Sequence, residues 1–239
     1  LGMPANQVAY LKKIKEDSEN PLIVVITGGS PMVMPEVEEL ADAILWVWYP
    51  GQEGGNAVAD VIFGNRAPSG KLPLTFPLSE EQLPSYEDYS MKERTYRYLT
   101  TKPLYPFGYG LSYADFRFND LYLDKETVGP DETLTVNVAV KNSGDQKAGE
   151  VVQLYLTVPD PEGNQPRWSL REFRRVSLNK GATAKVSFQL DRDDLVQFNE
   201  AGEEVVLSGT YRIHVGNASP GERSEELGAR VISATFEVE

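Results

Sequence analysis

The sequence contains no cysteine and only one histidine among its 239 residues. Without cysteine the chain has no disulfide, no thiolate nucleophile and no cysteine-ligated metal. A single histidine also leaves no histidine-based triad and no transition-metal site. We therefore expect no metal, and the composition indicates no other cofactor.

Positive charge and long apolar runs are scarce as well. The formal net charge of -13 leaves no basic face to neutralise phosphates, so we expect no nucleic-acid partner. The most apolar run, residues 43–49, falls well short of the roughly 20 apolar residues that span a bilayer, so we expect no membrane span. The first residues, Leu1 to Pro4, show no signal-peptide pattern. The compartment stays open among periplasmic, secreted and cytoplasmic.

The first quarter of the chain alternates between helical and strand patterns. In order, the patterns predict a helix at 4–18, a strand at 22–27, a short acidic helix at 35–41, a strand at 43–49 and a helix at 53–63. The continuous apolar runs are typical of parallel strands buried on both faces. Two such strands with three helices cannot close a core, so we expect further strands from elsewhere, most simply from an upstream stretch of the same polypeptide.

The regular pattern stops after the third helix and gives way to a stretch rich in tyrosine, arginine and proline. Residues 79–113 form this aromatic segment, which ends in Tyr105-Pro106-Phe107-Gly108-Tyr109 and Gly110 to Tyr113. A loop of this length is unusual unless it packs on something. A solvated linker is the alternative, although a linker would favour glycine, serine and charge over aromatic residues.

The second half of the chain shows short alternating apolar runs. They predict seven strands, at 121–123, 134–140, 150–158, 170–178, 184–190, 209–215 and 230–238. About seven such strands build an immunoglobulin-like or fibronectin type III-like β-sandwich. The predicted fold class is thus α/β plus all-β, with an incomplete α/β part at 1–78, the aromatic segment at 79–113 and a β-sandwich at 114–239.

Few residues stand out as carriers of chemistry. His214 lies on an alternating run opposite Ile213 and Val215, so we expect a solvent-facing strand residue rather than a catalytic base. A carboxylate pair, as glycosidases use, is the catalytic option that composition leaves open. With 36 acidic residues, composition cannot select the pair.

Two glycine-rich loops follow the predicted strands. Gly28-Gly29-Ser30 lacks the rest of a dinucleotide fingerprint or a P-loop, so we interpret it as a strand-to-helix turn. Residues 51–55 lie at the carboxyl edge of the sheet, where open α/β folds place their binding crevices. A helix N-terminus at this edge would favour Glu53, either as a ligand-facing residue or as a plain helix cap.

Three motifs together resemble the C-terminal half of glycoside hydrolase family 3, the bacterial β-glucosidases and β-xylosidases. They are residues 43–73, with Tyr49-Pro50-Gly51-Gln52-Glu53-Gly54-Gly55 at their centre; residues 104–113; and the sandwich runs at 149–155, 170–173 and 209–217. The resemblance implies that the α/β part is the C-terminal portion of an α/β sandwich domain. It also implies that the second half is the family's fibronectin type III-like domain.

The resemblance further implies a retaining exo-glycosidase without a metal, whose aspartate nucleophile on a (β/α)8 barrel and acid/base glutamate both precede residue 1. No catalytic residue is therefore assigned in this chain, and Gln52 and Glu53 are the candidates for facing the substrate. The expected partners are the barrel, on which this part packs, and through it an oligosaccharide or aryl β-glycoside. β-Glucosides come first and β-xylosides next; a homo-oligomer is left open.

A different class of function remains as an alternative. The apparent completeness of the β-sandwich also fits a non-catalytic carbohydrate-binding or structural module. Trp168 is the aromatic residue that we would test for sugar binding in that domain, with packing at the α/β part as its other role.

Overall fold

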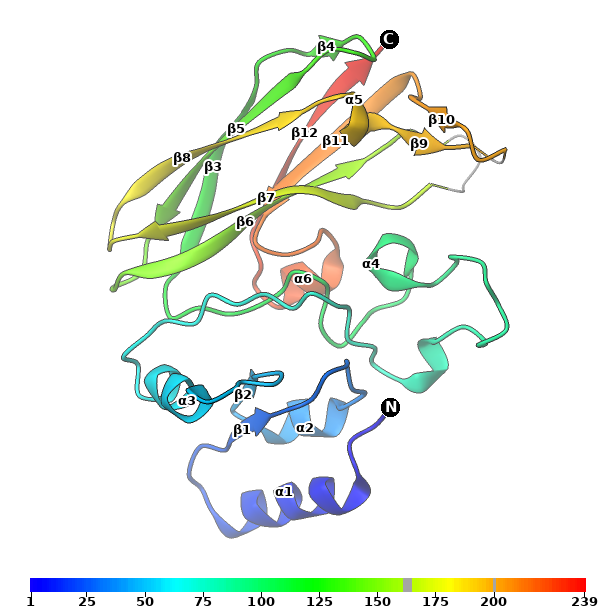
Figure 1. Cartoon of the computed structure of the whole chain (residues 1–239). Helices are drawn as coiled ribbons and strands as arrows, with labels where there is room; N and C mark the ends of the chain where they lie inside the picture. The colour runs from blue at the N-terminus through cyan, green and yellow to red at the C-terminus, as the bar shows by residue number, and fades with distance from the viewer. Residues whose placement is uncertain (161–164, 200) are drawn as a thin grey trace.

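Residues 1–160, 165–199 and 201–239 are described by a computed structural model. Figure 1 shows the α/β part at one end and the β-sandwich at the other, with the aromatic segment running between them. No helix in these ranges is long and apolar enough to cross a membrane.

The α/β part has the predicted order of elements. It contains α1 (Ala5–Asp17), β1 (Ile23–Ile26), α2 (Pro35–Leu40), β2 (Ala43–Trp46) and α3 (Gly54–Ile62). β1 and β2 are parallel and in register from the Ile23–Ala43 pair to the Ile26–Trp46 pair. Both strands therefore end at the same edge of the sheet.

One face of this small sheet is open among the described residues, so the expectation of strands buried on both faces, with cover from elsewhere, stays a prediction. Ile26 is buried in a cluster with Met34, Val37 and Phe76, whereas Ile23 and Val25 remain 42% and 41% exposed. Successive strand residues point to opposite faces. The described residues cover only one face, so the apolar side chains on the other face meet solvent.

The β-sandwich packs two mostly antiparallel sheets, of five and three strands, around one core. The five-stranded sheet has the order β4-β12-β11-β6-β7 and the three-stranded sheet has the order β3-β5-β8. Their bounds are β3 Phe116–Leu123, β4 Thr127–Val128, β5 Leu134–Asn142, β6 Ala148–Thr157, β7 Ser169–Leu178, β8 Thr183–Leu190, β11 Gly209–Gly216 and β12 Val231–Val238. Alternate residues of both sheets, such as Val136, Val138, Val152 and Ile213, fill the core.

The short elements were not predicted from the sequence. They are the two-residue strand β4, the hairpin of β9 (Gln197–Phe198) and β10 (Glu204–Val205), the 3-10 turn η1 (Glu80–Gln82), and the single-turn helices α4 (Thr95–Tyr98), α5 (Arg192–Leu195) and α6 (Glu222–Glu226). Each is too short to show a hydrophobic period. The structure also starts β3 at Phe116, five residues before the predicted strand, with a register shift between Asn119 and Tyr122.

The aromatic segment packs on the outer face of the five-stranded sheet. The rings of Tyr96 and Phe107 stack at 4.2 Å, and both meet the ring of Tyr155 edge to face. The Gln153 amide donates to the Gly108 carbonyl (3.0 Å) and accepts from the Tyr155 hydroxyl (2.5 Å). These contacts fit the expectation of a packed segment rather than a solvated linker.

Residues 68–73, which follow α3, contact the same sheet through a buried ion pair. Lys71 Nζ lies 2.8 Å from Glu150 Oε1 on β6, and the two side chains are only 9% and 2% exposed. Lys71 also donates to the Gly110 carbonyl at 2.8 Å. Asn217 donates to the second oxygen of Glu150 at 3.1 Å. A buried ion pair thus joins the α/β part, the aromatic segment and the sandwich.

His214 is not the solvent-facing residue that alternation suggested. It lies opposite Ile213 and Val215 as predicted, but it is half-buried, and its Nε2 atom lies 3.2 Å from Thr157 Oγ1. Burial, with a smaller contribution from Arg212, lowers the pKa of His214 to about 4, so the ring is neutral at pH 7. Its cross-strand neighbour Tyr155 lies beneath the aromatic segment, which covers this part of the outer face.

The proposed boundary at residue 78 remains a prediction. The two sides of that boundary pack together, because Phe76 exchanges backbone hydrogen bonds with Leu104 and Tyr105 of the aromatic segment. Arg223 of α6 ties the sandwich to the same region through the Leu104 carbonyl (3.0 Å) and Glu38 of α2 (3.3 Å).

Candidate functional site

The candidate site is the carboxyl edge of the small parallel sheet. The loop after β1 and the loop after β2 meet there, since the Gly28 amide donates to the Trp48 carbonyl at 3.3 Å and the Val47 amide donates to the Ile26 carbonyl at 3.0 Å. The edge is therefore a single surface built from two loops. It is also where open α/β sheets bind ligands.

An exposed tyrosine lies across this edge. Tyr49 is 80% exposed, and its hydroxyl oxygen would lie 2.6 Å from a Cβ atom added at Gly29, so the ring lies directly against the Gly29 backbone. The residue before it, Trp48, has a φ of 49°, a left-handed conformation that is rare for a bulky side chain. Such strain tends to occur at functional sites when the surroundings enforce it.

Trp46 and Trp48 support the edge from below. Their rings meet edge to face with centroids 5.6 Å apart, and Trp46 meets buried Phe76 in the same way at 4.9 Å. This aromatic stack fixes the end of β2 and hence the start of the loop that carries Gln52 and Glu53.

Gln52 and Glu53 are exposed on the loop that leads into α3. Glu53 occupies the N-cap position of α3, but its side chain does not bond the helix backbone. Its Oε2 atom accepts instead from Asn56 Nδ2 at 2.6 Å. The carboxylate is therefore oriented by a side chain of the first turn and remains accessible to a ligand.

The chemistry available at this edge is that of positioning. Glu53 is the single carboxylate in the two loops of this edge, residues 27–34 and 47–53. The described residues contain no group of His, Cys, Asp and Glu side chains that could hold a metal ion. An amide, a carboxylate and a tyrosine ring can orient a polyhydroxylated ligand through hydrogen bonds and ring contact. Gly28-Gly29-Ser30 lies in the loop between β1 and α2, as its interpretation as a strand-to-helix turn predicted.

Sequence reasoning singled out Gln52 and Glu53 but missed Tyr49. The signal was present in the sequence, because an aromatic residue followed by Pro50 and Gly51 directly after a buried strand must lie at the sheet edge. Its contact with Gly29, which is 20 residues away in the chain, is not linked to any pattern in the sequence.

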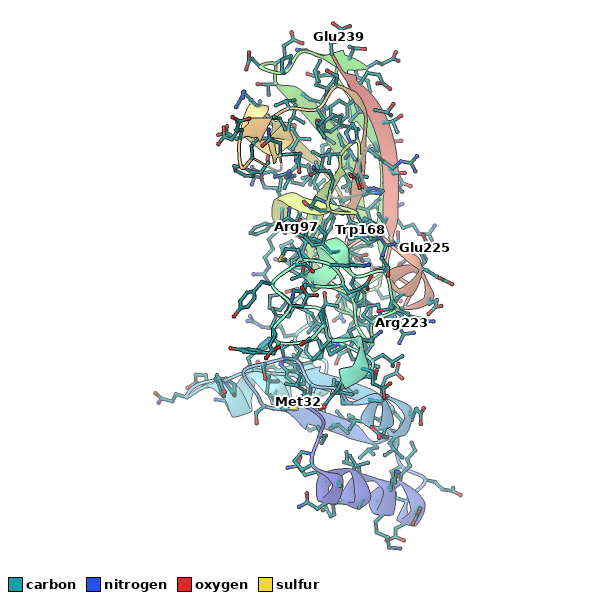
Figure 2. All side chains as sticks on the ribbon, turned by 90° about the vertical axis from the view of Figure 1, so that its right-hand side faces the viewer. Met32, Arg97, Trp168, Arg223, Glu225 and Glu239 are labelled. Carbon is teal, nitrogen blue, oxygen red and sulfur yellow. The ribbon has the colours of Figure 1, made fainter. Side chains whose placement is uncertain are left out.

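Trp168 lies at the junction rather than on an open surface. Its ring is beneath the guanidinium of Arg167 at 4.3 Å, and its indole nitrogen is buried without a hydrogen-bond partner among the described residues. Figure 2 shows Trp168 and Arg97 together where the aromatic segment meets the sandwich. This position favours its packing role over sugar binding.

Comparison with known families matches both halves of the chain. Residues 1–113 match the Glycosyl hydrolase family 3 C-terminal domain. Residues 150–219 match the Fibronectin type III-like domain. The order of the two matches agrees with the α/β part and the sandwich seen in the structure.

Curated relatives resemble almost the whole chain. A xylan 1,4-β-xylosidase from Xylanibacter ruminicola is 41% identical over 92% of this chain and 25% of its own length. A periplasmic β-glucosidase from Salmonella typhimurium is 34% identical over 100% of this chain and 31% of its own length. A solved GH3 β-glucosidase from Bifidobacterium adolescentis superposes with a TM-score of 0.85 at 31% identity, over 99% of this chain and 36% of that protein. The chain thus spans about a third or less of each of these proteins.

Proposed function

We propose that this chain, which contains the C-terminal domain of glycosyl hydrolase family 3 followed by a fibronectin type III-like domain, is the C-terminal portion of an exo-acting retaining β-glycosidase. The observation that carries the proposal is the likeness over more than nine tenths of the chain to proteins named β-xylosidase and β-glucosidase. In this proposal the nucleophile and the acid/base both lie on residues that precede Leu1 in the whole enzyme.

The open face of the small sheet supports a larger catalytic assembly. Ile23 and Val25 are apolar strand residues exposed on that face, and apolar sheet faces of this kind are normally covered. Further strands and helices of the same α/β domain would bury them. A (β/α)8 barrel would then meet the carboxyl edge, where Tyr49 and the Gln52-Glu53 pair are exposed.

We infer a supporting role for Gln52 and Glu53 in this arrangement. Their amide and carboxylate would orient the substrate or the catalytic groups of the barrel, while the barrel's own carboxylates perform bond cleavage. Terminal β-linked glucose is the first substrate class to test and β-linked xylose the second, since the relatives' names divide between the two. A purely binding or structural module remains the alternative.

The test uses a fusion in which this chain replaces the matching region of the Salmonella periplasmic β-glucosidase. Glu53→Gln and Gln52→Ala should each lower kcat/KM on aryl β-glycosides by about 10-fold, the loss of roughly one hydrogen bond to a charged or polar group. Glu19→Gln, an exposed acid just after α1, is the matched control and should leave kcat/KM unchanged.

This experiment distinguishes the two roles considered for Glu53, orienting the substrate and ordering the first turn of α3. Unchanged kcat/KM in Glu53→Gln and Gln52→Ala, together with a lower melting temperature for Glu53→Gln, would show that Glu53 only orders the first turn of α3 through Asn56. The ratio of activity on aryl β-glucosides and aryl β-xylosides ranks the two substrate classes.

A further inference from the structure

The two most exposed large hydrophobic side chains of the described residues are tyrosines that lie three positions apart. Tyr86 is 91% exposed and Tyr89 is 88% exposed. Both belong to the aromatic segment, yet neither takes part in the packing of that segment on the sandwich. We call these two residues the tyrosine platform.

A single arginine holds the backbone beneath the tyrosine platform. Arg94 donates through Nη2 to the carbonyls of Ser85 (3.1 Å) and Asp88, and through Nε to the carbonyl of Ser90 (3.1 Å). These three carbonyls bracket both tyrosines. A guanidinium presents its donors in a fixed planar fork, so one side chain can set the shape of the whole loop.

The backbone on either side of this arginine is strained. Glu93 and Thr95 have φ angles of 57° and 55°, and for a β-branched residue such as Thr95 this is a true outlier. The Glu93 carboxylate accepts from the Thr100 amide (3.0 Å) and hydroxyl (2.5 Å), which closes the loop. The loop is therefore preorganised, and ordering it on binding costs little conformational entropy.

The residues between the two tyrosines indicate which class of ligand the tyrosine platform would bind. The sequence Tyr86-Glu87-Asp88-Tyr89 places two carboxylates between two rings. A hydrogen bond from the Ser90 amide lowers the pKa of Asp88, so its carboxylate is charged at neutral pH. The cores of protein interfaces are depleted in Asp and Glu, which argues against a protein as the occupant. Rings that contact apolar C–H faces, and carboxylates that accept hydrogen bonds from hydroxyl groups, suit a polyhydroxylated ring instead.

We propose that the tyrosine platform binds neutral β-linked oligosaccharide chains, at a site separate from the Tyr49 and Gln52-Glu53 edge. The choice of a sugar chain rests on the proposed glycosidase function, while the platform itself rests on exposure and preorganisation. Its role is to hold the oligosaccharide that the enzyme shortens from its end. Two rings on one rigid loop can contact more than one sugar unit.

Isothermal titration of the 1–239 chain with cellotetraose and xylotetraose tests the proposal. We expect saturable binding of at least one of them, with a dissociation constant on the order of 0.1 to 1 mM. Tyr86→Ala and Tyr89→Ala should each weaken it by about 10-fold, the magnitude of an aromatic contact. Tyr10→Ala removes a tyrosine that is 67% exposed on α1 and should leave binding unchanged.

Arg94→Met provides a second arm that keeps both tyrosines in the sequence. It should weaken binding as much as either tyrosine variant, because the loop loses the donors that hold its three carbonyls. Circular dichroism checks that each variant is folded. The chain needs no catalytic activity here, so an inactive fusion would refute the proposed function without touching this result.

Three results would overturn the proposal. The first is the absence of saturable binding to either tetrasaccharide, and the second is equal weakening by Tyr10→Ala. The third is that Tyr86→Ala and Tyr89→Ala leave sugar binding intact but lower the melting temperature of the fusion and not that of the 1–239 chain. That last outcome would make the tyrosines a contact with the catalytic domain.

Discussion

Lys71→Met should lower the free energy of unfolding by about 3 to 5 kcal/mol, because it leaves the Glu150 carboxylate buried without its counter-charge. The two side chains are 9% and 2% exposed and 2.8 Å apart. The remaining partners of Glu150, Asn217 and the Val151 amide, are neutral and cannot replace the charge. Urea denaturation followed by tryptophan fluorescence measures the change.

The double variant Lys71→Met/Glu150→Gln separates charge from packing. It should recover most of the loss, since it removes the buried charge while keeping a side chain of the same shape. Lys180→Met is the matched control, because the Lys180–Asp145 pair has a similar length of 2.7 Å but is 65% and 96% exposed. An effect of Lys71→Met no larger than that of Lys180→Met would contradict the account of the junction.

Gly108→Ala should be comparably damaging for a steric reason. A Cβ atom at Gly108 would lie 2.1 Å from Gln153 Oε1 and 2.6 Å from the Tyr155 hydroxyl, both of which are buried, and the residue has a φ of +76°. The backbone cost of the left-handed region is about 1 to 2 kcal/mol and overpacking adds about 1 to 3 kcal/mol. We expect a combined loss of about 3 kcal/mol or more by the same denaturation measurement.

Gly64→Ala isolates the backbone part of this effect. Gly64 has nearly the same φ, +75°, but a Cβ atom there would meet nothing within 4 Å. The difference between the two variants in the loss of unfolding free energy therefore measures the steric contact between the aromatic segment and the sandwich. Equal losses at both positions would show that the aromatic segment does not pack tightly on the sandwich at Gly108.

Much of the fold followed from the sequence because its elements are long enough to show a period. The alternation at 134–140 and 184–190 predicted β5 and β8 to within two residues, and α1, α2 and α3 were predicted in their correct order. The α/β and sandwich assignment agrees with both family matches. Single-turn helices and two-residue strands, such as α6 and β9, have no such period and were missed.

What the sequence could not supply depends on contacts between distant segments. The His214 ring contacts Thr157 on β6, 57 residues earlier in the chain, so alternation within one strand alone suggested an exposed ring. The partner of Glu150 is Lys71, which is 79 residues away. The open side of β1 was not apparent either, since its apolar run is typical of a strand buried on both faces, whereas Ile23 and Val25 are exposed.

The candidate site was predicted in part. Gln52 and Glu53 are exposed at the carboxyl edge where the pattern placed them, and their closeness to substrate remains a proposal. Tyr49 and the tyrosine platform were missed because exposure of an aromatic residue is a property of packing. In a sequence, Tyr86 and Tyr89 look the same as Tyr96, which is half-buried and stacks on Phe107.

Hydrolysis of aryl β-glycosides tests the central claim most directly, with the 1–239 chain and the Salmonella fusion measured in parallel. The account predicts no turnover of aryl β-glucosides or β-xylosides by the chain alone and turnover by the fusion, with retention of configuration at the anomeric carbon. The full-length Salmonella protein serves as the positive control, and a cooperative melt shows that the fusion is folded. A folded fusion that hydrolyses no aryl glycoside, or a chain that hydrolyses one alone, would contradict the account.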